Sequence, residues 1–77
     1  MVSEQEALVP VLLAEVREIL FARIACNTIR AEGGELVAHH NGRVGRVNVP
    51  HIDNLMLQAR SLADKLEAEL TPLTRAV

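Results

Sequence analysis

Apolar residues recur at helical spacing through the first third of the chain. From Leu8 to Ile29 they fall three or four positions apart, which is the period of one face of an α-helix. A pair of glycines at 33–34 follows, and glycine often ends helices because it adopts the left-handed conformation without a Cβ clash. The pattern predicts one long helix over about residues 4–32. Pro10 marks either a bend in this helix or its true start.

This predicted helix is apolar around an unusually large part of its circumference. One apolar stripe runs through Val9, Val16 and Leu20, and a second, rotated stripe runs through Leu12 and Ile19. A helix that faces a single partner needs an apolar stripe of only about 100°. We therefore expect a second copy of the chain to cover the remainder, with Leu12, Val16, Ile19 and Leu20 in the interface between copies.

The last third of the chain predicts a second helix, over about residues 50–71. Its apolar positions alternate steps of four and three, as in a heptad seam. The seam comprises Ile52, Met56, Ala59, Ala63, Leu66, Leu70 and Leu73. The small side chains of Ala59 and Ala63 favour close approach of a neighbouring helix. Met56, Ala59, Ala63 and Leu66 are expected to complete the interface between copies.

The middle of the chain, about residues 35–49, predicts a β-hairpin. Asn41 and Gly42 are the strongest short turn signal, because a two-residue type I′ turn needs positive φ at both positions. This turn places His40 opposite Arg43 and fixes the register of both strands. The other expected pairs are His39 with Val44, Ala38 with Gly45, Val37 with Arg46, and Leu36 with Val47.

Together these elements predict a mainly α fold with a minor β component. Two long helices flank a short hairpin in the order α-β-β-α, within one domain of residues 1–77. At this length a single chain has a small core, while 49% of its residues are hydrophobic. The expected architecture is therefore a homodimeric helical bundle, with the hairpins either projecting from it or joined in a small sheet.

The charge is distributed unevenly although the net charge is only −2. Residues 36–52 contain two arginines and all three histidines but no acid. Donors suited to an anion or to an acidic partner surface gather there: His39, His40, Asn41, Arg43 and Arg46. Two arginines supply few phosphate contacts, so a solvated hairpin tip that keeps its edges soluble is the alternative interpretation.

Metal binding and catalysis have little support in the sequence. Adjacent strand residues point to opposite faces, so His39 and His40 cannot readily share one ion. No pair among these histidines, His51, Asp53 and Cys26 has the spacing of a specific ligand motif. Cys26 falls on an apolar helical stripe, which indicates a buried structural thiol. No nucleophile elbow, phosphate loop or paired-carboxylate signature is present. We therefore expect no enzyme activity, no metal and no cofactor.

The function expected from these features is that of a small oligomeric interaction or regulatory protein presenting a surface to a protein partner. The alternative is a dimeric protein that uses the basic hairpin to bind nucleic acid or another anionic ligand. Phe21 is the one aromatic residue, so most stacking chemistry is excluded. No apolar run approaches the roughly 20 residues of a membrane span, and early glutamates do not suit a signal peptide, so a cytoplasmic protein is expected.

Overall fold

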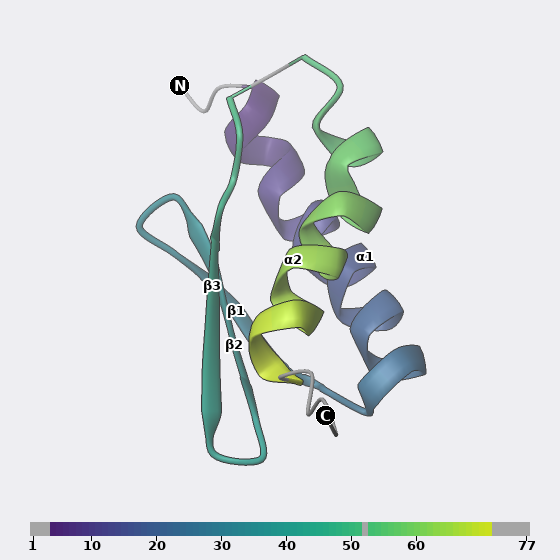
Figure 1. Cartoon of the computed structure of the whole chain (residues 1–77). Coiled ribbons are helices and arrows are strands. Elements are labelled where there is room, and N and C mark those ends of the chain that lie inside the picture. The colour runs from purple at the N-terminus through teal and green to yellow at the C-terminus, as the bar shows by residue number, and fades with distance from the viewer. Residues whose placement is uncertain (1–3, 52, 72–77) are drawn as a thin grey trace.

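Two helices lie on one face of a three-stranded sheet in the computed structural model, which describes residues 4–51 and 53–71. Figure 1 shows the sheet nearly edge-on, with both helices on the same side of it. In chain order the elements are α1 (Glu4–Ile24), β1 (Thr28–Glu32), β2 (Glu35–His40), β3 (Arg43–Asn48), the 3₁₀ helix η1 (Leu55–Gln58) and α2 (Ala59–Leu70). The strands form an antiparallel meander in the order β1-β2-β3.

The predicted fold class, a mainly α homodimeric helical bundle, is therefore wrong. The chain adopts an α+β fold because a third strand lies where the sequence predicts the end of the first helix. Helix α1 ends at Ile24, and Ala25 takes a left-handed conformation with φ of 58°. The β-branched Thr28 and Ile29 then favour extended backbone. The apolar spacing from Ile24 to Ile29 had extended the predicted helix across this break.

The glycine pair that was interpreted as a helix stop is instead the turn between β1 and β2. Gly33 and Gly34 have φ values of 57° and 81°, and Glu32 pairs with Glu35 across them. This is the geometry of a two-residue hairpin turn with positive φ at both positions, for which two glycines are well suited. The same residue pair is thus typical of two structures, and the strand pairing decides between them.

The predicted hairpin register between β2 and β3 is confirmed. His40 pairs with Arg43 across the turn, and the four other expected pairs follow in order to Leu36 and Val47. Asn41 and Gly42 have φ values of 51° and 79°, as a type I′ turn requires. The signal succeeds here because the turn chemistry is local and specifies the register of both flanking strands.

Gly42→Ala is expected to lower the free energy of unfolding by about 1 kcal/mol, because a left-handed conformation is unfavourable for a residue with a Cβ atom. Asn41→Gly is the matched control, since it places the most permissive residue at the other positive φ of the same turn. Its stability should change by less than about 0.5 kcal/mol. Urea unfolding followed by circular dichroism measures both, and equal losses in the two variants would contradict the explanation.

The second predicted helix starts later than expected but ends where expected. The 3₁₀ helix η1 begins at Leu55, α2 begins at Ala59, and α2 ends at Leu70. The Thr71 hydroxyl and backbone N–H both donate to the Glu67 carbonyl, at 2.6 and 2.9 Å. Two positions of the predicted seam, Ile52 and Leu73, lie outside the described residues.

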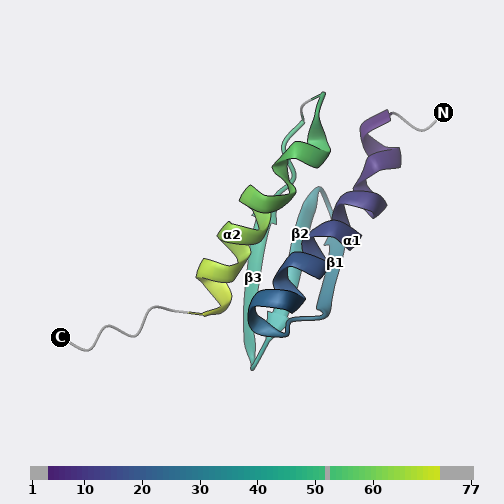
Figure 2. The same cartoon turned by 90° about the vertical axis from the view of Figure 1, so that its right-hand side faces the viewer.

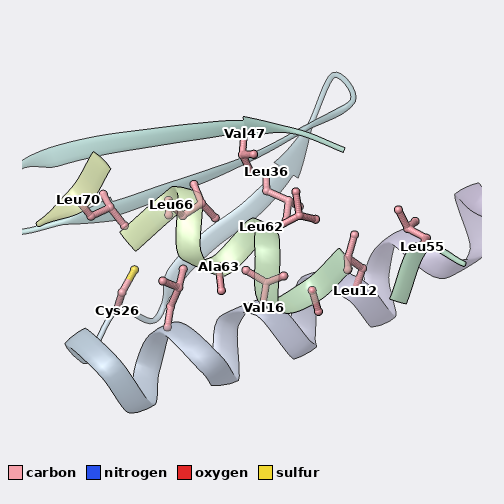
Figure 3. Close-up of a cluster of buried hydrophobic side chains, with 13 residues drawn as sticks. Leu12, Val16, Cys26, Leu36, Val47, Leu55, Leu62, Ala63, Leu66 and Leu70 are labelled. Atoms are coloured by element: carbon pink, nitrogen blue, oxygen red, sulfur yellow. The ribbon is translucent and has the colours of Figure 1, made fainter. Parts of the chain in front are cut away.

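The core forms between the helices and the covered face of the sheet within a single chain (Figure 3). Leu12 and Val16 of α1 and Leu62 of α2 are buried beside Leu36 and Val47 of the sheet. Of the residues expected between copies, the following are buried in this core: Leu12, Val16, Leu20, Ala59, Ala63 and Leu66. Ile19 and Met56 are half-buried against it. The burial assigned to a second copy is thus largely achieved by the added strand and by α2.

Helix α2 approaches β3 closely at Gly45. A Cβ atom at this position would lie 3.2 Å from Cγ of Leu70 and 3.4 Å from Cδ2 of Leu66. Such spacing is tighter than nearly all real Cβ contacts. The absence of a side chain at Gly45 therefore sets how near α2 can pack to the sheet.

Candidate partner-binding face of the sheet

The two faces of the sheet differ because the helices cover only one of them. Strand register places alternate residues on the uncovered side, here termed the outer face. The outer face comprises Thr28, Arg30 and Glu32 of β1, Glu35, Val37 and His39 of β2, and Val44, Arg46 and Asn48 of β3. All three strands of the sheet present side chains together on this face.

The centre of the outer face is apolar and its rim is charged. Val37 is only 1% exposed, yet it lies outside the hydrophobic core cluster. Its cross-strand neighbours are Arg30 and Arg46. The aliphatic part of an arginine side chain can cover an apolar neighbour while the guanidinium stays in water. Val44 on the neighbouring strand is 48% exposed. The arrangement is a buried valine between two arginines, with a half-exposed valine farther along the strand of one of them.

Each of these arginines has a carboxylate partner within the chain. Arg30 Nε donates to Glu32 Oε2 at 2.8 Å, and Arg46 Nη1 lies 3.5 Å from Glu35 Oε1. Both pairs are substantially exposed to solvent and are worth little to stability. The acid-free segment seen in the sequence is thus supplied with acids from neighbouring elements, which lowers its attraction for an external anion.

The predicted anion-binding residues do not come together as one site. His39 and Arg46 belong to the outer face, whereas His40 and Arg43 lie on the opposite face of the sheet. Arg43 Nε donates to the Glu69 carbonyl of α2 at 3.4 Å. The amide nitrogen of Asn41 lies 3.3 Å from Nε2 of His40 at the turn. The hairpin therefore presents two small donor groups in opposite directions.

The two edge strands of the sheet are protected to different degrees. On β3, the Arg46 backbone N–H donates to Glu69 Oε1 at 2.9 Å, so a side chain of α2 caps this edge. In an antiparallel ladder every second residue of an edge strand directs its N–H and C=O outward. Counted from their turns, these are Val44, Arg46 and Asn48 on β3 and Ile29 and Ala31 on β1. Within residues 4–51 and 53–71, no side chain caps the β1 edge.

An open cleft of about 380 Å³ lies between the start of α1 and the turn joining β1 to β2. Its lining includes Glu6, Val9, Val49 and His51, together with Glu32 and Glu35. The last two carboxylates already pair with the outer-face arginines. Nowhere in the described part of the chain do three His, Cys, Asp or Glu side chains gather to hold a metal ion. The cleft therefore lacks the convergent polar groups typical of a built ligand site.

Cys26 is buried, as the sequence predicts, but it does not lie within a helix. It occupies the connection between α1 and β1, is 1% exposed, and its thiol donates to the His39 carbonyl at 3.4 Å. A buried thiol in an apolar site is poorly placed to act as a nucleophile. Its role in the described structure is to join this connection to β2.

Arg23 joins the two helices near the end of α1. It donates to Asp64 Oδ1 at 2.5 Å and to Glu67 Oε1 at 3.0 Å, both on α2. The hydrogen bond that Arg23 donates to Asp64 raises the pKa of Arg23 above its usual value most, and the hydrogen bond to Glu67 raises it further. The charged cluster fixes the orientation of α1 against α2 at the surface. It uses no residue of the outer face.

Comparison with known proteins adds no information on these residues. No protein-family model, curated protein or solved structure matches the chain. Among the described residues, no helix combines the length and the apolar character needed to cross a membrane. Arg30, the second arginine beside Val37, was missed as a site residue because its segment was assigned to a helix. The alternation of residues 28–32 and the two glycines after them were the signals that could have revealed it.

Proposed function

We propose that the protein is a small, non-enzymatic interaction module that docks a partner protein on the outer face of its sheet. The observation that carries the proposal is the half-exposed Val44 on a sheet face that no helix covers, next to the buried Val37 and its two arginine neighbours, Arg30 and Arg46. Interfaces commonly combine such an apolar centre with a polar rim in which arginine is enriched. A rigid sheet on a packed helical layer gives this surface a defined shape.

The partner chemistry follows from the groups on this face. An apolar side chain of the partner would contact Val44, and carboxylates on the partner would replace Glu32 and Glu35 as acceptors for the two arginines. Exchange of one exposed ion pair for another changes the free energy little, so the pairs contribute orientation and specificity. The apolar contact supplies most of the affinity.

Nucleic-acid binding is the less favoured alternative. Arg43 and Arg46 lie on opposite faces of the sheet, and Arg46 and Arg30 already pair with carboxylates. Affinity for a phosphate backbone rises with the number of cations that contact it together. A single copy offers two arginines on the outer face, so this surface suits a protein better than a duplex.

A photo-crosslinking amino acid at Val44 should form an adduct with a partner protein in the native cells, whereas the same residue at Ser61 should not. Ser61 is exposed on α2, away from the sheet, and is therefore a matched surface control. Arg46→Glu should reduce the Val44 adduct severalfold because it reverses one rim charge. Mass spectrometry of the crosslinked species measures the yield. Equal adducts at both positions, or an adduct indifferent to Arg46→Glu, would argue against the outer face.

A further inference from the structure

We infer that the β1 edge is the docking surface for a second copy of this chain, which adds its own β1 in antiparallel orientation to give a six-stranded sheet. This interface lies at the edge of the sheet, although its ion pairs use Arg30 and Glu32, which also belong to the outer face. It differs from the helical bundle expected from the sequence, because the contact is made by a strand edge and the flank of α1. The inference stands independently of the partner proposed above.

The first support is the asymmetry between the two edges of the sheet. Glu69 caps the middle of the β3 edge through the Arg46 N–H, whereas Ile29 and Ala31 direct backbone groups outward from β1 with no side-chain cap among the described residues. Four of the five β1 residues are exposed, and none of them is proline or lysine. Natural sheets usually protect such an edge, because an open one pairs readily with another strand.

The second support is charge complementarity between two copies of the same strand. A two-fold axis through Ala31 places Arg30 of each copy directly opposite Glu32 of the other, so two ion pairs form across the interface. Opposite charges at directly facing positions stabilise antiparallel strands. A register centred on Arg30 would instead place the two arginines opposite each other, which is unfavourable. The charges of β1 thus favour the register centred on Ala31 over the register centred on Arg30.

The third support is an exposed aromatic side chain on the same flank. Phe21 is 57% exposed and lies two positions before Arg23, which reaches α2. Residues two apart lie on nearly opposite sides of a helix, so Phe21 faces away from α2. Figure 2 shows α1 over the β1 side of the sheet and α2 over the β3 side. Phe21 therefore belongs to the flank that ends in the open strand.

The strand edge and the helix flank together meet the requirement of a stable interface better than either does alone. A few backbone hydrogen bonds bury too little surface, since stable interfaces bury on the order of 1,000 Å² or more. Antiparallel strands are related by a two-fold axis perpendicular to the sheet, so both helical layers stay on the same side. The two α1 helices then become neighbours, and Phe21 of each copy is covered at their contact.

The wild-type protein should be a dimer in sedimentation equilibrium at micromolar concentration. Arg30→Glu and Glu32→Arg should each weaken this dimer about tenfold, because each places like charges at both facing positions. Mixing the two variants should restore association as a heterodimer. The pair within each chain remains broken in both variants, so only pairing between chains accounts for the rescue.

Arg46→Glu is the matched control, since it breaks an ion pair of the outer face on β3, which the β1 contact does not use. It should dimerise like the wild type. Phe21→Glu should weaken the dimer about tenfold, and its circular dichroism spectrum should match the wild type. The inference would be overturned if the wild type stayed monomeric at 100 times the micromolar concentration of the first experiment. It would also be overturned if the two like-charge variants did not associate on mixing.

Discussion

Leu66→Ala is expected to lower the free energy of unfolding by about 2–5 kcal/mol. Leu66 is fully buried on α2, within the core cluster that α2 shares with α1 and the sheet. Removal of three carbon atoms loses their transfer free energy and leaves a cavity that packed neighbours fill only in part. A domain of this length has a total stability of roughly 4–12 kcal/mol. The variant is therefore expected to be marginally folded.

Urea unfolding monitored by far-ultraviolet circular dichroism measures this loss, with Leu57→Ala as the control. Leu57 has the same side chain but is 76% exposed on η1, so its truncation should change stability by less than about 0.5 kcal/mol. Similar losses in both variants would show that Leu66 is not in the core. If Leu66→Ala does not fold, Leu66→Met keeps the volume and should retain a cooperative transition.

Gly45→Val is expected to lower the free energy of unfolding by about 2–3 kcal/mol, although strand propensity alone favours valine by up to about 1 kcal/mol. Packing wins because even the first carbon of the new side chain would lie 3.2 Å from Leu70. The two further methyl groups must then displace α2 from β3. Overpacking of this kind commonly outweighs a gain in local propensity.

The neighbouring residue provides the control for this substitution. Val44 follows the opposite face of the same strand and is half-exposed, so Val44→Ile should leave stability within about 0.5 kcal/mol of the wild type. Thermal unfolding and urea titration both report the difference. A Gly45→Val protein more stable than the wild type would mean that α2 does not approach the sheet at this position.

The hairpin was predictable from sequence to the level of individual pairs, whereas the first strand was not. Asn41 and Gly42 determine a turn by their own conformational preferences, and that turn sets every pair of β2 with β3. Strand β1 has no comparable local signal at its start. Its Ile29 continues a helical spacing, and only pairing with β2, which depends on residues farther along the chain, makes the extended form more stable.

The candidate site was predictable only in part for the same reason. The hairpin register already places His39 and Arg46 on one face and His40 and Arg43 on the other. The acids near them arrive through tertiary contacts: Glu69 comes from α2, 23 positions beyond Arg46 in the sequence. Charge counted along a segment therefore overstated the basic character of the hairpin.

The meander separates two helices that need each other, and this has a consequence for synthesis of the protein. Arg23 and Asp64 lie 41 positions apart, and the core leucines of α2 follow every other described element in the chain. Until α2 has emerged from the ribosome, Leu12, Val16 and Leu36 lack part of the core that buries them. The nascent chain is then open to chaperones, and α2 completes the fold as the last described element to emerge.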